Sequence, residues 1–429
     1  MKLFERLFKH ITLAFLLCFF APSTASSPNN EPTLQADSIE ISLLTCGPRQ
    51  QVYSLYGHTA IRFQDKQSGR DIAINYGVFS FDQPFFVLRF VFGLTDYEMG
   101  IAPFDIFEWE YGPTGCGVRQ QVLNLTAQEK MAIAQAVDRN MEPQNRVYRY
   151  NFFYDNCTTR ARDIIANNLN GRIVYDSSTP QHLNTSTPQH HNTLAQYPTF
   201  RNLIHNYNET HRWARFGNDL LLGVKADYNT TFEQQQFLPE RLCADFERAH
   251  IISADGTKRN LVSSSFWLFE PTTKQRSIQQ TNMSILDVFS PLVTFSILSI
   301  LTLIIAIVEY RRKRIIWVFD TSIMLTTGAC GLLLFAMIFS QHPTVSLNLQ
   351  ILLLNPINIF MLYSVAKAAR QNRIHWWTKA WSALILLLLA GSFLQSYAEG
   401  ITIVALSLLL RNISNIYTFK NTGSKQPEA

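Results

Sequence analysis

Tyr154-Asp155-Asn156-Cys157-Thr158-Thr159-Arg160 leads straight into a segment with the spacing of a helix, and the rest of the chain can be read outward from it. Apolar positions recur at helical intervals and an Asn-Gly pair closes the segment: Ala161, Ile164, Ile165, Leu169 and Asn170-Gly171. Asp155 or Asn156 is the expected N-cap, which places Cys157 in the first turn. Unpaired backbone N–H groups and the helix dipole stabilise a thiolate there. The alternative is a small buried apolar residue at a helix start.

A second motif, Tyr56-Gly57-His58-Thr59-Ala60-Ile61-Arg62-Phe63, alternates in the manner of a β-strand, and residues 71–79 continue the pattern after a turn at residues 66–69. If the hairpin is centred between Lys66 and Gln67, His58 lies opposite Asn75. Both side chains then lie on a face whose small residues allow a helix to approach: Ala60, Ala73 and Gly77.

A strand histidine, an amide beside it and a cysteine at a helix start form a thiol-nucleophile arrangement. In this hypothesis Cys157 is the nucleophile, His58 its base and Asn75 the residue that orients the imidazole. The alternative for His58 is a structural histidine whose hydrogen bonds are satisfied within the sheet. Spacing alone indicates a cysteine acyltransferase or hydrolase and goes no further.

The order of histidine on a strand and then cysteine at a helix start resembles the circularly permuted papain-like fold of NlpC-type peptidases and lecithin–retinol acyltransferases. More closely, the chain resembles the Lnb-type lipoprotein N-acyltransferases of Bacteroidota. The resemblance covers nearly the whole mature chain and is carried by residues 43–48, 56–62, 74–77, 153–160, 217–223 and 237–240. It implies transfer of an acyl chain from a glycerophospholipid to the α-amino group of the lipidated N-terminal cysteine of a diacylated lipoprotein.

The predicted fold class is α+β: a permuted papain-like periplasmic domain followed by an all-α transmembrane domain of five helices. Residues 1–25 have the basic start, short apolar run and small-residue end of a secretory signal peptide, with a retained anchor as the alternative. The expected boundaries are 38–262 for the catalytic domain, 263–284 for a linker, 285–418 for the transmembrane domain and 419–429 for a cytoplasmic tail. Within the first domain, Thr126 and Glu129 have the spacing of a capping box.

Five apolar segments are expected to span the membrane, namely residues 285–309, 315–339, 349–366, 381–396 and 401–417. Basic residues cluster after the first, third and fifth of them: Arg311-Arg312-Lys313-Arg314, then Lys367, Arg370, Arg373 and Lys379, then Lys420 and Lys425. The opposite loops carry no Lys or Arg. The positive-inside rule therefore predicts a multi-pass protein of the bacterial inner membrane with a periplasmic N-terminal domain and a cytoplasmic C-terminus.

Composition limits the partners. The formal net charge of +5 is no nucleic-acid footprint, because much of the basic excess flanks the spans. The expected partners are a glycerophospholipid acyl donor, a diacylated lipoprotein acceptor and the membrane itself. No C-x-x-C pair occurs, and neither a metal nor a cofactor is expected. An oxidising periplasm allows a disulfide among Cys46, Cys116 and Cys243, whose pairing the sequence leaves open.

The outer loop from His342-Pro343 to Asn348, continuing to Asn355-Pro356, is similar to a His-Pro, Asn and Asn-Pro signature of the same family. That resemblance suggests His342 and Asn348 as substrate-binding residues that close the site or hold a phospholipid headgroup. A structural turn and helix cap is the alternative. Inside the spans, Asp320 and Arg411 could pair with each other, mark a headgroup path or lie at an interface.

Two rival functions remain open. The first is a periplasmic cysteine hydrolase of the same fold, either a cell-wall peptidase or amidase or a lipase, which has no need of a multi-span anchor. The second is a non-catalytic receptor or scaffold on a membrane anchor. A Cys157→Ala variant with full biological activity would favour the scaffold, and free fatty acid without an N-acylated product would favour the hydrolase.

Overall fold

The computed structural model describes residues 36–49, 51, 54–79, 84–175, 197–272 and 289–419. The predicted signal peptide, most of the predicted linker and the tail beyond residue 419 lie outside the described residues.

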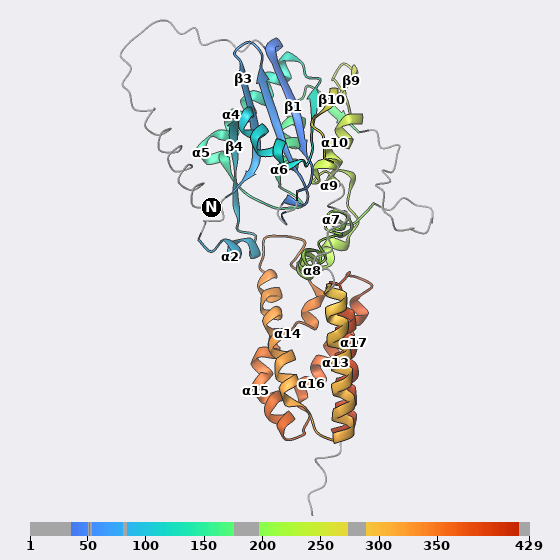
Figure 1. Cartoon of the computed structure of the whole chain (residues 1–429). Helices are drawn as coiled ribbons and strands as arrows, with labels where there is room; N and C mark the ends of the chain where they lie inside the picture. Colours follow the sequence, from blue (N-terminus) through green and yellow to red (C-terminus); the bar gives the residue numbers. More distant parts are fainter. Residues whose placement is uncertain are drawn as a thin grey trace, which may run out of the picture. The chain divides into compact units, whose positions relative to one another are not determined.

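A mixed α+β domain is built around an antiparallel sheet of seven strands (Figure 1). Their order is β10-β5-β1-β2-β3-β4-β6. The strands are β1 (Ile39–Cys46), β2 (His58–Asp65), β3 (Arg70–Val78), β4 (Asp96–Pro103), β5 (Val118–Leu123), β6 (Val147–Arg149) and β10 (Val262–Phe269). A small second sheet joins β7 (Arg172–Val174), β8 (His250–Ile252) and β9 (Lys258–Asn260). Because β10 pairs with β5, the sheet continues beyond the boundary predicted at residue 262.

Helices cover both faces of the large sheet. One face packs on α4 (Ala127–Met141), α6 (Cys157–Ala166) and α10 (Pro239–Arg248), where Ile61 and Ile74 meet Ala161 and Ile165 in a dry core. The other face packs on α3 (Phe104–Tyr111), whose Phe107 lies in one buried cluster with Ala60 and Ala73. The predicted capping box of α4 is present, with Thr126 and Glu129 bonded reciprocally.

The β2–β3 hairpin differs from the prediction by two residues. Ala60, not His58, is the register partner of Asn75, and Asp65 pairs with Arg70. A shift of two keeps every side chain on its expected face, since the side-chain period of a strand is two. The helix that packs against the small residues Ala60 and Ala73 is α3. Helix α6 covers the opposite face of the sheet, where larger β-branched residues such as Ile61 and Ile74 supply the apolar surface.

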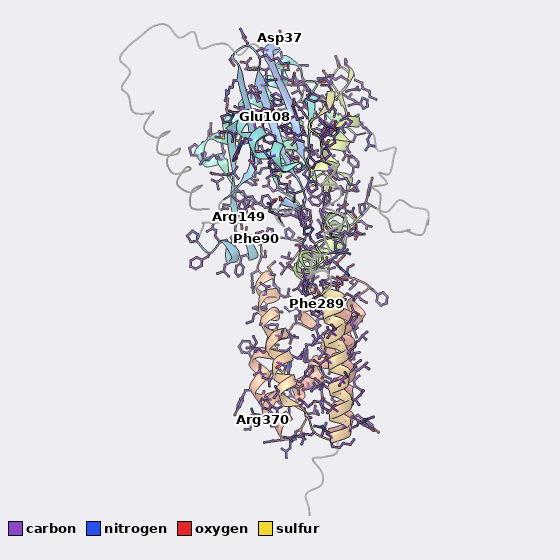
Figure 2. The ribbon with its side chains drawn as sticks, viewed as in Figure 1. Asp37, Phe90, Glu108, Arg149, Phe289 and Arg370 are labelled. Carbon is purple, nitrogen blue, oxygen red and sulfur yellow. The ribbon has the colours of Figure 1, made fainter. Side chains whose placement is uncertain are left out.

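The remaining short elements of the first domain are η1 (Ala36–Ser38), α2 (Phe86–Val91), η3 (Gly112–Thr114), α5 (Pro143–Arg146), α7 (Phe200–His205), α8 (Arg212–Leu221), η4 (Val224–Asp227) and α9 (Phe232–Gln235). Helix α2 presents exposed apolar side chains, among them Phe90, which is labelled in Figure 2.

The C-terminal region is helical, with α13 (Pro291–Arg312), α14 (Trp317–Met337), η5 (Leu349–Leu352), α15 (Ile357–Arg370), α16 (Trp376–Gly391) and α17 (Ile401–Phe419). Within the described residues, four helices are long and apolar enough to cross a membrane, with residues 349–370 taken as one of them. The expectation of five full spans is corrected at α16. Its 16 residues extend about 24 Å at 1.5 Å per residue, less than the roughly 30 Å of a hydrocarbon core.

Candidate functional site

Cys157 is the first residue of α6, and Asn156 is the N-cap. The Asn156 side chain accepts from the backbone N–H groups of Thr158 and Thr159 at 2.9 and 3.0 Å. Its amide nitrogen donates to the carbonyl oxygens of Phe152 and Phe237, each at 2.9 Å. One asparagine therefore fixes the start of the helix and ties it to a distant segment, so the position of Cys157 is set by both.

His58 opens β2, and its Nε2 lies 3.0 Å from Asn75 Oδ1. An amide oxygen can only accept, so Nε2 carries the proton of this bond and Nδ1 is left for Cys157. The Cys157 thiol and the His58 imidazole lie close enough for each to shift the pKa of the other through charge and hydrogen bonding, and both residues are partly accessible. The structure thus brings together Cys157, His58 and Asn75, despite the shifted hairpin register.

The pKa values of the pair move in opposite directions. Burial raises the pKa of the Cys157 thiol, but the charge and hydrogen bond of His58 outweigh it, and the pKa lies below its ordinary value. Burial lowers the pKa of His58, yet the Cys157 charge and the bonds to Cys157 and Asn75 raise it above its ordinary value. Each residue therefore stabilises the charged form of the other.

Two glycines make room for this pair. Gly57 has φ +77°, and a Cβ there would lie 2.5 Å from the Cys46 carbonyl oxygen. Gly77 has φ +95°, and a Cβ there would lie 3.8 Å from both Cys157 Cβ and Tyr148 Oη. A side chain at either position would strain the backbone, and one at Gly77 would also fill the space beside the thiol.

Tyrosines surround the thiol, and sequence reasoning missed them. Burial raises the pKa of Tyr97, Tyr148 and Tyr150, and the nearby Cys157 raises each further, to about 12 for Tyr97. These phenols therefore stay protonated and can donate hydrogen bonds. The Tyr148 hydroxyl is buried and has no hydrogen-bond partner among the described residues. The signal was present in the sequence as two tyrosines at alternate positions of the strand that leads to Cys157.

The helix start offers one free backbone donor. The N–H groups of Thr158 and Thr159 are taken by Asn156, and that of Arg160 bonds the Asn156 carbonyl oxygen. No acceptor for the Cys157 N–H occurs among the described residues. The Cys157 N–H and the Tyr148 O–H are thus the two donors without acceptors next to the sulfur. We call Cys157, His58, Asn75 and Tyr148 the cysteine corner.

His342 and Asn348 lie elsewhere. Asn348 is buried at the N-cap of η5, where its Nδ2 donates to the Leu220 carbonyl oxygen at 2.8 Å and its Oδ1 accepts from Gln350 N at 3.0 Å. His342 lies beside α2, with its ring centroid 6.4 Å from that of Phe90, and burial lowers its pKa. The contacts described for these two residues include neither Cys157 nor His58, and Asn348 has the structural role of a cap.

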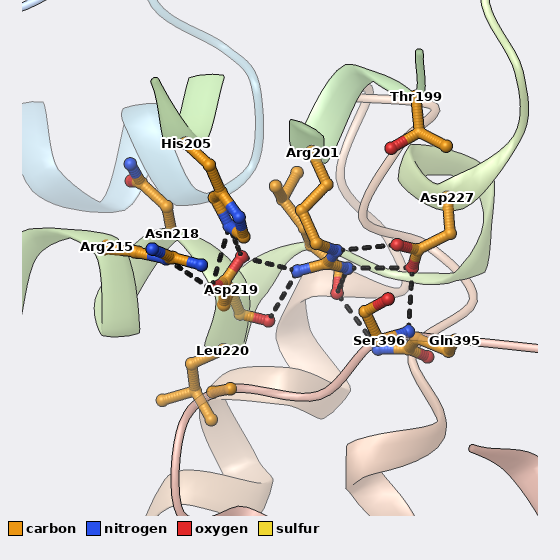
Figure 3. A network of polar contacts seen from close by, with 12 residues as sticks. Thr199, Arg201, His205, Arg215, Asn218, Asp219, Leu220, Asp227, Gln395 and Ser396 are labelled. Carbon is orange, nitrogen blue, oxygen red and sulfur yellow. Dashed lines mark hydrogen bonds and ion pairs between the residues drawn. The ribbon is translucent and has the colours of Figure 1, made fainter. Parts of the chain in front are cut away.

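A polar joint connects the first domain to the helical region (Figure 3). Arg201 is 1% exposed and donates to Asp219 Oδ1 and Asp227 Oδ1, each at 2.8 Å. Gln395 Nε2 donates to the Leu222 carbonyl oxygen at 3.1 Å. We define the joint by Arg201, His205, Asp219, Asp227, Asn348, Gln350 and Gln395. His205 belongs to the joint because its Nε2 bonds Asp219 Oδ1 at 2.8 Å.

Backbone groups also cross the joint. Gly223 N donates to the Thr344 carbonyl oxygen and Val224 N to that of Leu347, each at 2.8 Å. A Cβ on Gly223 would lie 2.1 Å from the Leu347 carbonyl oxygen, so only glycine allows this approach. The joint is therefore held by main chain as well as by side chains.

Other residues singled out from the sequence have structural surroundings. Cys46, Cys116 and Cys243 are buried free thiols, so none of the disulfides considered is present. Burial raises the pKa of Cys46 and of Cys243. A cavity of about 510 Å³ lies between β5 and α10, and Cys157 is not among its lining residues. Arg411 pairs with Glu309 at 2.7 Å and with Asp320 at 2.6 Å inside the helical region.

The described residues contain no cluster of three or more His, Cys, Asp or Glu side chains able to hold a metal ion. A cysteine, a histidine and an amide meet at one corner of an α+β domain that continues into apolar helices. This arrangement defines a membrane-anchored α+β protein in which a cysteine, a histidine and an amide share one site.

The family follows from two matches. Residues 27–197 match the Lnb N-terminal periplasmic domain, and residues 281–422 match the Lnb transmembrane domain. The chain belongs to the Lnb family, so it is a membrane-anchored lipoprotein-processing protein with a periplasmic sheet domain. No curated protein and no solved structure matches the chain.

Proposed function

We propose that this protein is an acyltransferase that moves an acyl chain from a glycerophospholipid, through a Cys157 thioester, to the α-amino group of the lipidated N-terminal cysteine of a lipoprotein. The observation that carries the proposal is the meeting of Cys157, at the start of α6, with His58, which is bonded to Asn75; the pKa of the thiol is lowered and that of the imidazole is raised. Its membership of the Lnb family supplies the lipoprotein context.

In the first half-reaction the Cys157 thiolate attacks the ester carbonyl carbon of the phospholipid. The tetrahedral intermediate collapses when its C–O bond breaks, and the leaving alkoxide of the lysophospholipid takes the proton of the His58 imidazolium. The products are a thioester on Cys157 and a neutral His58. Asn75 holds the ring through Nε2 and keeps Nδ1 directed at the reacting atoms.

In the second half-reaction the neutral α-amine of the lipoprotein attacks the thioester carbonyl carbon. The nitrogen gives a proton to His58, the C–S bond breaks, and Cys157 leaves as thiolate. An amide has formed and the thiolate–imidazolium pair is restored. Every proton given up by His58 in the first half-reaction is recovered in the second, so no other acid or base is required.

The negative oxygen of each tetrahedral intermediate needs donors. The Cys157 N–H and the Tyr148 O–H have no acceptor among the described residues, so both are available at the sulfur. A donor of this kind is typically worth about 3 kcal/mol of transition-state stabilisation. Because burial and the nearby Cys157 raise its pKa, Tyr148 keeps its proton throughout the pH range of the reaction.

A thioester intermediate must meet the amine before it meets water, and the apolar helices favour that outcome. They hold the periplasmic domain at the membrane, where phospholipid and diacylated lipoprotein both reside. A soluble hydrolase would gain nothing from such helices. A periplasmic position of Cys157 is part of the proposal, in keeping with the family of the N-terminal domain.

The proposal is tested with the full-length protein in phospholipid micelles and a synthetic diacylated lipopeptide. Mass spectrometry should detect the N-acylated peptide and one lysophospholipid per transfer. Omission of the peptide should leave an acyl group on Cys157. Release of free fatty acid or cut peptide without an N-acylated product would identify a hydrolase instead. Full activity of a Cys157→Ala protein in complementation would identify a scaffold.

A further inference from the structure

Helix α2 exposes apolar side chains beside the helical region. Phe85 is 77% exposed, Leu88 55% and Phe90 49%. Phe85 has φ +58°, a left-handed conformation that is unfavourable for a bulky residue. Exposed apolar side chains gathered in this way are typical of a surface that meets another protein or a membrane. The patch therefore needs an apolar partner.

The position of α2 relative to the helices identifies that partner as lipid. Gln341 N donates to the Phe92 carbonyl oxygen at 3.0 Å, and Gly93 packs against His342 so closely that a Cβ would lie 3.2 Å from it. Gln341 follows the end of α14, where Phe339 is 65% exposed. The apolar residues of α2 thus continue the lipid-facing surface of a candidate membrane span.

Two arginines lie directly beside this patch and share one carboxylate. Arg89 Nη2 lies 3.0 Å from Asp96 Oδ2, and Arg149 Nε lies 2.7 Å from Asp96 Oδ1. Arg149 Nη1 also donates to Gln341 Oε1 at 3.2 Å. Arg89 Nε is buried and has no hydrogen-bond partner in the part of the chain that the structure describes. Figure 2 labels Arg149 and Phe90 in the same region.

The charge of this cluster suits a phosphate. Among the described residues, two guanidinium groups against one carboxylate leave a formal charge of +1, and the arginine side chains are 41% and 42% exposed. A phosphodiester carries one negative charge on two oxygens, which the fork of an arginine binds in pairs. The neighbouring Arg146 differs, because it pairs one to one with Glu98 at 3.0 Å and leaves no excess charge.

The cluster is one residue away from the tyrosines around the thiol. In the β4–β6 ladder Asp96 pairs with Arg149, and the next pair is Tyr97 with Tyr148. Side chains alternate, so Asp96 and Arg149 lie on the opposite side of this ladder from Tyr97 and Tyr148. Strand β6 is the edge strand of the sheet and is only three residues long. A lipid bound at the arginines therefore has only this short edge between it and the tyrosines.

We propose that Arg89 and Arg149 bind the phosphate of the donor phospholipid while Phe85, Leu88 and Phe90 of α2 sit in the outer leaflet among its acyl chains. This headgroup site rests on the proposed function and assigns it a donor subsite. A diacylated lipoprotein has no phosphate on its glyceryl group, so the site distinguishes donor from acceptor. His342 borders the site through Phe90, and Asn348 is not part of it.

The test compares Arg89→Gln/Arg149→Gln with the matched control Arg146→Gln in the full-length protein. Phosphatidylglycerol in mixed micelles is the donor, and the lipopeptide acceptor is kept saturating. The double variant should raise the apparent KM for phosphatidylglycerol by about tenfold or more, the usual effect of losing a charge-assisted hydrogen bond, with kcat nearly unchanged. The control should leave KM unchanged.

A second donor separates binding from folding and chemistry. Acylation of Cys157 by p-nitrophenyl palmitate, which has no phosphate, should proceed at the same rate in the wild type and the double variant. An unchanged KM in the double variant, an equal rise in Arg146→Gln, or an equal loss with p-nitrophenyl palmitate would overturn the headgroup site. A wild type that takes no acyl chain from phosphatidylglycerol would instead refute the acyltransferase itself.

Discussion

The cysteine corner and the joint are both polar clusters that are at least partly buried, but they use hydrogen bonds in opposite ways. In the joint Arg201 gives its donors to Asp219, Asp227 and the carbonyl oxygen of Leu222. In the cysteine corner the Tyr148 O–H and the Cys157 N–H have no acceptor among the described residues. Saturated networks stabilise, and donors held without acceptors are available to a reacting group. The contrast separates the part that holds the protein together from the part proposed to react.

Removal of the Cys157 thiol should abolish the reaction and leave the stability of the protein almost unchanged. Cys157→Ala should reduce N-acylation at least ~10⁴-fold, since no other nucleophile can form the acyl intermediate. Its unfolding temperature should change by no more than about 2 °C, because one sulfur atom at a partly accessible site contributes little packing. Mass spectrometry of the lipopeptide and thermal unfolding measure the two effects. Cys116→Ala, which removes a buried thiol elsewhere, should retain activity, and its inactivity would contradict the assignment.

Removal of the buried guanidinium should have the reverse pattern. Arg201→Met leaves Asp219 and Asp227 without their cation and should lower the free energy of unfolding by about 3–5 kcal/mol. Denaturant unfolding in detergent checks this. The control is Arg212→Gln, which breaks the more exposed pair with Glu399 and should cost at most about 1 kcal/mol. Equal effects of the two substitutions would show that burial of the joint is irrelevant to its strength.

The same joint should weaken in acid. Burial raises the pKa of Asp219, but His205 and Arg201 lower it more, and the net shift is downward. A carboxyl whose folded pKa is lowered contributes stability that is present above its unfolded pKa and lost as the pH falls through the folded one. This loss should be smaller in Arg201→Met.

A smaller effect is expected for the unpaired phenol. Tyr148→Phe removes one donor and no bulk, and should lower kcat by about 10²-fold, within the range for loss of one oxyanion donor. The KM for phospholipid and the unfolding temperature should stay close to those of the wild type. Single-turnover acylation of Cys157 measures the effect. Tyr97→Phe serves as the matched control, and an equal loss there would assign the effect to general packing.

The smallest effect sharpens the electrostatic part of the comparison. His58→Ala should move the pH midpoint of Cys157 alkylation by iodoacetamide upward, because burial then acts on the thiol without the opposing imidazolium. In the wild type the midpoint should lie below that of an ordinary thiol. Asn75→Ala should produce a shift in the same direction but of lesser size. A pH midpoint that is unchanged in His58→Ala would show that His58 does not act on the Cys157 thiol.

Local signals in the sequence predicted the parts of the site that depend on local structure. Asn156 was one of two expected caps and is the cap observed, because an asparagine before a helical segment can satisfy its first N–H groups. Thr126 and Glu129 formed the expected box for the same reason. His58 and Asn75 are neighbours as predicted, although the predicted strand register was wrong by two residues. A shift of two residues keeps each side chain on the same face of the sheet.

Features that depend on distant contacts were not predictable. Nothing near Arg201 in the sequence indicates that Asp219 and Asp227 will surround it. Helix α3 packs against Ala60 and helix α6 against Ile61. Which helix covers which face of the sheet depends on the apolar surface of each face, and that surface forms only when the strands have assembled. The short α16 had enough apolar residues for a span, but the helix begins at Trp376 and ends at Gly391.

Gly223 has a consequence for how the two regions can be exchanged between relatives. Its backbone lies directly on the outer loop, with a carbonyl oxygen where a methyl group would be. The contact depends on the exact course of both main chains at this point. A hybrid protein made from two relatives should therefore fold only when the 219–227 segment and the 341–350 loop come from the same relative. In a working hybrid, each junction between the two parental sequences should therefore lie outside these two segments, which are inherited together.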